Sequence, residues 1–214
     1  MALGSLIRGL LGPRLGRRAG ENYREIYVDL TKVAAALAAV IPRGAHVLDV
    51  GGGDGQPINH LLSVRPDLTI TTLDPAPMVG QWIDARYDGQ VERLPGTTLA
   101  KFVACPHAHP DVILLADVMH HIPESARHKF LESVGVLLEH APGIHIIVKD
   151  IEPGHWRALL SFLSDRYVTG DRNVSLISRD DVTRLFDRVL GRLYREDTNL
   201  FEKDSPNYAI VFRR

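Results

Sequence analysis

The residues best suited to chemistry begin with an acid that leads a run of glycines. Asp49, Gly51, Gly53 and Gly55 form an Asp-x-Gly-x-Gly-x-Gly pattern, and Gly52 adds one more glycine. Glycines permit a tight turn and let a ligand approach the backbone without meeting a Cβ atom. An acid at this place suits a ligand that carries positive charge rather than a pyrophosphate.

Two other nucleotide-binding motifs do not fit this segment. A dinucleotide fingerprint, G-x-G-x-x-G, needs a third glycine where the chain has Gln56 or Ile58, depending on the register. A P-loop needs Gly-Lys-Ser or Gly-Lys-Thr after its glycines, and the sequence has neither. A glycine-rich turn with a purely structural role stays as the alternative.

A second acid follows the next apolar run, in the segment T-T-L-D-P-A. The carboxylate of Asp74 can accept hydrogen bonds from both hydroxyls of a ribose if the segment before it is a strand. Taken alone, an Asp that precedes a proline, here Pro75, is more often part of a turn. The glycine pattern upstream favours the ribose-binding interpretation.

A third group of polar residues follows the apolar run at 111–116. Asp117, His120 and His121 lie in the segment D-V-M-H-H. An imidazole titrates near neutral pH, so His120 or His121 can take a proton from a hydroxyl as a general base. The structural alternative for each His is a ring that caps a helix or packs under the loop. Lys149 and Asp150 follow a later apolar run and can contact a substrate or pair with another charge.

Alternating strand and helix patterns predict how these residues are positioned. Short apolar or alternating runs predict strands over 45–50, 68–73, 90–94, 111–116, 143–148, 192–196 and 208–212. Helical spacing predicts helices over 23–40, 57–64, 78–86, 97–103, 124–139 and 155–167, and one that starts after an N-cap at Ser178 and runs to about 189. This order is typical of a parallel sheet with helices on both faces, whose ligands bind at the carboxyl ends of the strands.

At the glycine segment the chain resembles the class I S-adenosylmethionine (SAM)-dependent methyltransferases, whose first motif has this form. With the element order, the resemblance implies an α/β fold: a Rossmann-like, seven-stranded, mostly parallel sheet with helices on both faces and an antiparallel edge hairpin. It implies that Asp49 orients the loop and the amino-acid end of SAM, and that Asp74 binds the ribose. The cofactor contacts implied are Asp49, Gly51, Gly52, Gly53, Asp74, Pro75, Gly96, Thr97, Asp117 and Val118.

The D-V-M-H-H segment is similar to the corresponding segment of small-molecule methyltransferases. The resemblance implies an enzyme that transfers a methyl group to an oxygen or nitrogen of a small molecule, with no metal required. The catalytic candidates are His120, His121 and Asp117. The candidates for contact with the acceptor are Tyr23, Tyr27, Lys149 and Trp156.

Two alternative functions stay open at this point. The first is an RNA 2′-O-methyltransferase, in which Asp117 and Lys149 would act with Lys32 and Glu202. The formal net charge of −1 provides no basic face for a phosphate backbone and argues against it. The second is a non-catalytic subunit with a methyltransferase fold, which the intact glycine motif disfavours.

Length and composition predict one α/β domain over 45–214 with a helical segment over 1–44 as a cap. The first twenty residues contain four arginines and no acid, which fits a short amphipathic helix that packs on the domain or a membrane-surface or targeting helix. No apolar run is long enough for a transmembrane helix. A single cysteine, Cys105, fits a cytoplasmic protein, and the oligomeric state is open, with a homodimer compatible.

Overall fold

A computed structural model describes residues 30–105, 108–141, 143–154, 174–191, 194–196, 200–201 and 205–213. Several predictions lie outside these residues: the arginine-rich segment, the helix over 155–167, and the roles of Tyr23, Tyr27, Trp156 and Glu202. The division into a cap over 1–44 and a domain over 45–214 stays a prediction.

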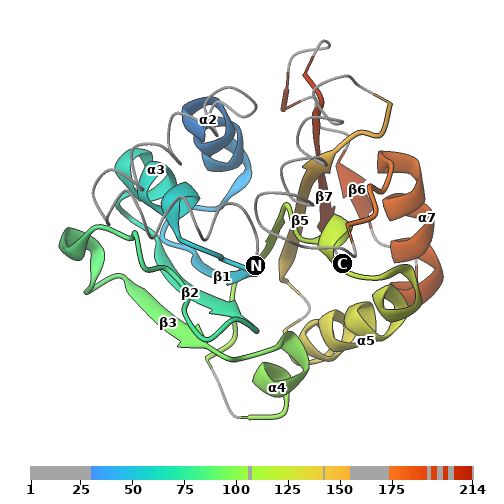
Figure 1. The fold of residues 1–214 in the computed structure, drawn as a ribbon, viewed down its shortest axis with the longest axis horizontal. Coiled ribbons are helices and arrows are strands. Elements are labelled where there is room, and N and C mark those ends of the chain that lie inside the picture. The colour runs from blue at the N-terminus through green and yellow to red at the C-terminus, as the bar shows by residue number, and fades with distance from the viewer. Residues whose placement is uncertain are drawn as a thin grey trace, which may run out of the picture.

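A central sheet organises the described residues, with strand order β3-β2-β1-β4-β5-β7-β6 (Figure 1). Strands β1 to β5 run parallel to one another, whereas β7 is antiparallel to both β5 and β6. The predicted Rossmann-like α/β fold with a mostly parallel sheet is therefore confirmed. The strands are β1 His46–Val50, β2 Thr69–Asp74, β3 Val91–Pro95, β4 Val112–Ala116, β5 His145–Ile151, β6 Tyr194–Glu196 and β7 Asn207–Arg213.

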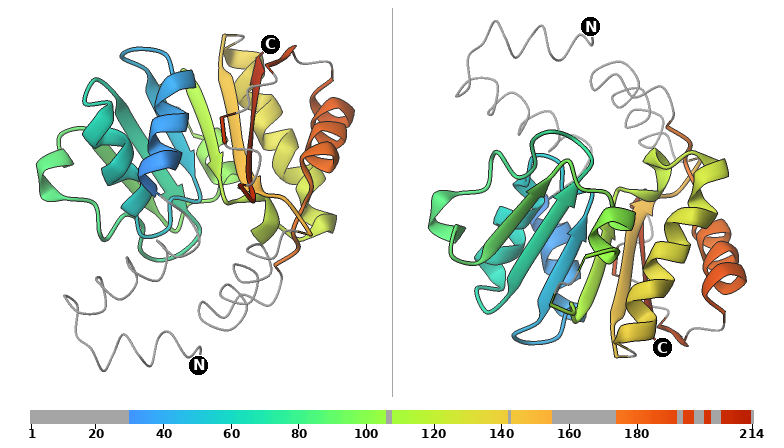
Figure 2. Two further views of the ribbon diagram at one scale, coloured as in Figure 1. Left: turned by 90° about the horizontal axis from the view of Figure 1, so that it is seen from above. Right: turned by 90° about the horizontal axis from the view of Figure 1, so that it is seen from below.

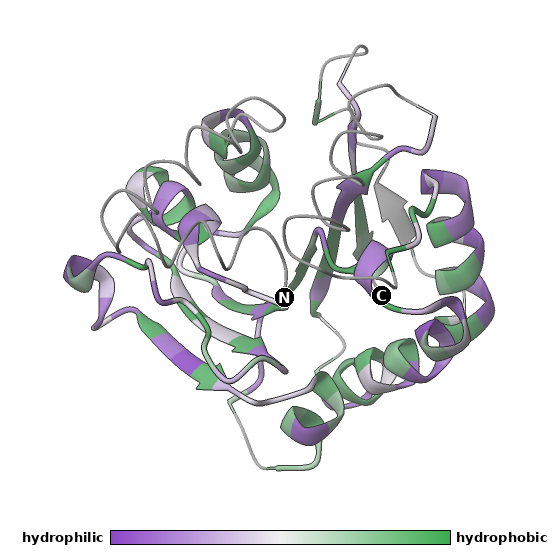
Figure 3. Cartoon of the chain, viewed as in Figure 1, coloured by the Kyte–Doolittle hydropathy of each residue, from purple (hydrophilic) through white to green (hydrophobic). Residues whose placement is uncertain are grey.

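Helices cover both faces of this sheet (Figures 1 and 2). Helices α2 (Leu30–Val40) and α3 (Gln56–Val64) pack on one face, and α4 (Leu99–Val103), α5 (Glu124–His140) and α7 (Arg179–Leu190) lie on the other. These helices carry both hydrophobic and hydrophilic residues (Figure 3), and the residues that they bury are mostly apolar. The central strands are consequently apolar on both sides, which explains continuous runs such as V-I-L-L-A in β4.

The N-terminus of α7 confirms the predicted cap. The Ser178 hydroxyl accepts a hydrogen bond from the Asp181 backbone N–H at 3.1 Å, and Asp180 and Asp181 occupy the first turn. Carboxylates there interact favourably with the helix dipole.

The predicted helix over 78–86 is wrong. The segment is a loop that ends in a short 3-10 helix, η1 (Ala85–Tyr87). The Gly80 N–H donates to the carbonyl of Gly53 at 2.8 Å, and the Trp82 N–H donates to the carbonyl of Asp54 at 2.9 Å. Because the N–H groups of Gly80 and Trp82 donate to the glycine turn, they are not available for the hydrogen bonds of a helix.

The parallel strands bring their carboxyl ends to one edge of the sheet. β1 and β2 end beside each other in register, with Asp49 opposite Thr72 and Val50 opposite Leu73. β4 is the other neighbour of β1, and β5 follows it. The acids at or just after these strand ends therefore gather at one place, as the sequence predicts.

Candidate active site

The glycine turn between β1 and α3 adopts a conformation that other residues rarely reach. Gly51, Gly53 and Gly55 have φ values of 77°, 54° and 83°. At Gly52 the restriction is steric, because a Cβ atom would lie 1.8 Å from Oγ1 of Thr72 and 2.4 Å from Oδ2 of Asp49. The N–H of Gly51 donates to the carbonyl of Leu73 at 2.7 Å, which fastens the turn to β2. The pattern in the sequence is thus a geometric requirement of this turn.

Asp49 lies beneath the turn and is 6% exposed. Its Oδ2 accepts a hydrogen bond from the hydroxyl of Thr72 at 2.8 Å. Burial raises the pKa of Asp49 to about 6; the Thr72 bond opposes this shift and the nearby charge of Asp74 adds to it. A carboxylate in this environment gains from a cationic ligand, which would offset the cost of its buried charge.

Asp74 ends β2 and faces the same turn. Its Oδ2 accepts from the N–H of Gly53 at 3.1 Å and its Oδ1 accepts from the N–H of Ala76 at 2.8 Å. Each carboxylate oxygen has room for another donor. Two adjacent hydroxyls of a ribose fit this arrangement, so the residues present suit the nucleoside that the fold family implies.

The segment predicted to lie beside the adenine is tied to the same strand end. The N–H of Thr97 donates to the carbonyl of Asp74 at 2.9 Å, and the N–H of Gly96 donates to the carbonyl of Ala76 at 2.7 Å. Pro75 and Gly96 are exposed and Thr97 is half-buried. The structure thus brings together Asp74, Pro75, Gly96 and Thr97, which were predicted from two separate segments.

A small cavity of about 60 Å³ opens between α2, α3 and the sheet. Its apolar lining includes Leu30 and Val33 of α2. Asp49, Gly51 and Asp117 also line it, so it reaches the glycine turn. Val118 is buried against the same turn, because a Cβ atom on Gly51 would lie 2.9 Å from its Cγ2.

Asp117 follows β4 and forms an ion pair with Lys149 of β5. The ammonium of Lys149 lies 2.7 Å from both carboxylate oxygens, and the lysine side chain is 1% exposed whereas that of Asp117 is 40% exposed. Burial would raise the pKa of Asp117, but the charge and hydrogen bonds of Lys149 outweigh it, with His120 contributing, and hold that pKa below its ordinary value. Asp117 is also the only described residue other than glycine with a positive φ, at 58°. Such a conformation marks a residue held in place by its surroundings.

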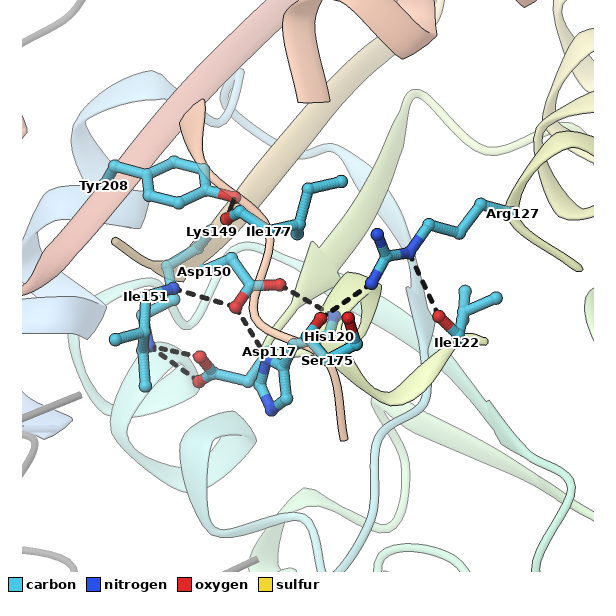
Figure 4. Close-up of polar contacts among 10 residues, drawn as sticks. All are labelled: Asp117, His120, Ile122, Arg127, Lys149, Asp150, Ile151, Ser175, Ile177 and Tyr208. Atoms are coloured by element: carbon cyan, nitrogen blue, oxygen red, sulfur yellow. Dashed lines mark hydrogen bonds and ion pairs between the residues drawn. The ribbon is translucent and has the colours of Figure 1, made fainter. Parts of the chain in front are cut away.

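His120 is fixed by a second buried acid, Asp150. Nδ1 of His120 lies 2.6 Å from Oδ1 of Asp150, and the backbone N–H of His120 donates to Oδ2 at 3.3 Å (Figure 4). His120 is 2% exposed and Asp150 is fully buried. With the Asp150 carboxylate as hydrogen-bond acceptor, Nδ1 carries the proton of the neutral ring and Nε2 carries the lone pair. His121 is half-buried and its ring centroid lies 4.2 Å from that of His120.

The strand alternation explains why the two charged pairs stay separate. Lys149 and Asp150 are neighbours in β5, so their side chains leave opposite faces of the sheet. Lys149 shares the face of Ile147, which packs with α2 and α3, whereas Asp150 shares the face of Val148, which packs with α5 and α7. The Lys149–Asp117 pair and the Asp150–His120 pair come close to each other at the carboxyl edge of the sheet, where Asp117 lies near His120.

Sequence reasoning did not find the outer support of His120. The carbonyl of His120 accepts from the N–H of Ser175 at 2.8 Å, and the guanidinium of Arg127 donates to the carbonyls of Ser175 at 2.7 Å and Ile122 at 3.0 Å. The hydroxyl of Tyr208 donates to the carbonyl of Ile177 at 3.0 Å (Figure 4). The sequence does indicate that Arg127 faces the protein interior, because it has helical spacing to Leu131 and Val134, which α5 buries.

The acids and His120 also form a cluster of metal-ligand type. Asp117, His120 and Asp150 each offer an atom within 4.8 Å of the others. The Lys149 ammonium, however, occupies the position of a cation beside Asp117. The 2.6 Å contact between His120 and Asp150 is the length of a strong N–H···O bond. This arrangement favours proton transfer over metal binding.

The comparisons with known proteins agree with this geometry. The sequence matches the family described as "Methyltransferase domain" over residues 20–189. The chain belongs to this methyltransferase-domain family. The predicted membership of the class I SAM-dependent methyltransferases is thereby confirmed, and SAM is the cofactor of that class.

Solved structures share the fold of this methyltransferase domain. Human N-acetylserotonin methyltransferase in complex with SAM superimposes with a TM-score of 0.62 and 21% identity, over 87% of this chain and 52% of that one. A SAM-dependent methyltransferase from Archaeoglobus fulgidus has a TM-score of 0.62 and 14% identity, over 90% of this chain and 98% of that one. At these identities the likeness concerns the fold.

Curated relatives match a shorter part of the methyltransferase domain. Ribosomal RNA small subunit methyltransferase G of Salinispora tropica is 40% identical over 70 residues, which are 33% of this chain and 26% of the relative. The match thus spans about a quarter of that relative's length. None of the helices that the structure describes has the length and apolar character to cross a membrane.

Proposed function

We propose that the protein transfers a methyl group from SAM to a hydroxyl oxygen of a small molecule, with His120 as the general base. One observation carries the proposal: a buried acid, Asp150, holds Nδ1 of His120 at 2.6 Å, at the edge of the sheet where the glycine turn and Asp74 lie. A nucleophile is activated in this way by an imidazole that a third group orients. An acceptor that needs no deprotonation would not require such a pair.

In this proposal one set of residues binds the cofactor and another set binds the acceptor. SAM held there would supply an electrophilic methyl group on its sulfur, with the neutral sulfide as leaving group. Asp74 binds the ribose hydroxyls, and Asp49 with the glycine turn holds the cationic amino-acid end. Fixed donors and acceptors of this kind align the reactants, which contributes most of the rate in such a displacement.

The acceptor's proton moves to His120. As the oxygen attacks, Nε2 takes the hydroxyl proton, and the Asp150 carboxylate stabilises the imidazolium that forms. The Arg127 and Ser175 contacts keep the main chain of His120 in place. His121 stays a second candidate base, because it adjoins His120 and is half-buried.

The negative charge at the carboxyl edge of the sheet favours a small-molecule acceptor over RNA. Asp49, Asp54, Asp74 and Asp117 lie in or beside the turn, and the cation of Lys149 is neutralised by Asp117. A phosphate backbone requires the opposite field. RNA remains the second candidate, because the curated relatives above act on ribosomal RNA according to their name.

The experiment supplies labelled SAM, a panel of small phenols and alcohols, and ribosomal RNA, and compares the protein with two variants. We expect label to enter a small molecule, and His120→Ala to lower that transfer by about 100-fold or more, since general bases contribute this much. His128→Ala, which changes an exposed His of α5, serves as the control and should retain full transfer.

Two results would contradict the proposal. Label that enters only RNA would establish the second candidate. Equal transfer by the His120→Ala variant and the unchanged protein would remove His120 from the mechanism, even with a small-molecule acceptor.

A further inference from the structure

Two exposed histidines lie side by side at the edge of the sheet that the proposed reaction does not use. His109 precedes β4, and His140 ends α5 shortly before β5 begins. Their ring centroids are 6.1 Å apart, and the angle between the ring planes is 13°. The parallel strands β4 and β5 begin at this amino edge, whereas the glycine turn and Asp117 lie at the opposite, carboxyl edge.

The ring nitrogens of this pair are available to a ligand. Nδ1 of His140 lies 2.7 Å from the carbonyl oxygen of Val136, so Nδ1 carries the proton of the neutral ring and Nε2 carries the lone pair. In the part of the chain that the structure describes, Nε2 of His140 and both ring nitrogens of His109 have no hydrogen-bond partner. Both residues are exposed. A ligand from solvent can therefore reach one lone pair on each ring without breaking an existing bond.

Two imidazoles at this separation suit a transition-metal ion. Imidazole nitrogen is a preferred ligand of Zn²⁺, Cu²⁺ and Ni²⁺. Because each metal–nitrogen bond is about 2.0–2.1 Å long, two imidazoles on one ion have centroids about 5–6 Å apart, and exposed side chains reach this spacing by small rotations.

The surroundings of His140 also favour a cation. A hydrogen bond from the second ring nitrogen to a backbone carbonyl is the usual outer support of a metal-binding histidine, and Val136 provides it. His140 lies in the last turn of α5, where the helix dipole places partial negative charge.

We propose that His109 and His140 bind one divalent ion of the zinc, copper and nickel group, with water completing its coordination. The ion joins the segment before β4 to the end of α5. It stabilises the folded chain, because the unfolded chain does not hold the two rings together. The site lies at the other end of β4 from the cofactor turn, so it is independent of the proposed methyl transfer.

Calorimetric titration of the untagged, metal-free protein with zinc chloride tests the site. Magnesium chloride is the control, because Mg²⁺ prefers oxygen ligands. We expect one Zn²⁺ per chain and no binding of Mg²⁺ in the same concentration range. His109→Ala and His140→Ala should each weaken Zn²⁺ binding by at least about tenfold, since loss of an outer partner of a ligand already costs about 10- to 100-fold.

Two variants serve as matched controls. His128→Ala removes another exposed histidine of α5, which pairs with Glu132, and Cys105→Ser removes an exposed thiol. Both should bind Zn²⁺ like the unchanged protein. Saturating Zn²⁺ should also raise the urea midpoint of the unchanged protein and of both controls, but not that of His109→Ala or His140→Ala.

Several results would overturn the proposal. They are no binding of Zn²⁺, equal affinity in His109→Ala and His140→Ala, or loss of binding in either control. Binding that only His120→Ala abolishes would instead place the ion at the cluster of Asp117, His120 and Asp150. SAM binding, measured on the same variants, is expected to stay unchanged, and a failed metal site would leave the proposed function intact.

Discussion

Asp49 is a carboxylate placed where its charge is unfavourable until a ligand arrives. Its side chain is buried, and its carboxylate accepts a hydrogen bond from the hydroxyl of Thr72. Its pKa near 6 lies well above that of an exposed Asp. The protein without cofactor thus keeps a residue whose ionisation disfavours the folded state at neutral pH.

A pH series on the protein without cofactor tests this property. Because the folded pKa of Asp49 is raised to about 6, its contribution to stability is fully present only below the unfolded pKa and is lost as the pH rises through about 6, which amounts to roughly 3 kcal/mol over the full range. Urea unfolding of the protein and of Asp49→Asn should show that the variant's stability, relative to the unchanged protein, improves by about 2 kcal/mol between about pH 4 and about pH 7. A difference that does not change with pH would show that Asp49 titrates normally.

The glycine turn is an element that the sequence made predictable, since its chemistry is local. A tight turn was predicted there, and the left-handed φ values of Gly51, Gly53 and Gly55 are ones that glycine adopts without a Cβ penalty. The loop over 75–84 was not predictable in the same way. Its N–H groups bond to carbonyls of the turn, which are distant in sequence, and apolar spacing therefore suggested a helix where none forms.

Gly52→Ala tests the turn as a packed element. A methyl group would meet Thr72 and Asp49, so we expect a loss of about 1–3 kcal/mol in the free energy of unfolding and weaker binding of SAM. Urea unfolding and calorimetry measure the two effects. Gly89→Ala is the matched control, because nothing lies within 4 Å of the added atom. Equal stability of the two variants would mean that the turn relaxes easily.

At the scale of the whole molecule, the sheet order turns separate sequence motifs into one site. β1 lies between β2 and β4, so Asp49, Asp74 and Asp117 share an edge although they come from three segments. This much follows from parallel strands and was predictable. The pairing of Lys149 with Asp117 and of Asp150 with His120 was not, because it depends on which face each residue of β5 occupies and on the backbone conformation after β4.

The proposed roles of the other active-site residues all require that the glycine turn and Asp74 form the SAM site. Isothermal titration of the protein with SAM tests it directly, with Asp74→Ala as the variant and the exposed Asp88→Ala as the control. We predict saturable binding that Asp74→Ala weakens by about 10- to 100-fold, because the ribose hydroxyls lose their acceptor, while Asp88→Ala binds like the unchanged protein. No heat with the unchanged protein, or equal affinity in the Asp74→Ala variant, would contradict the account.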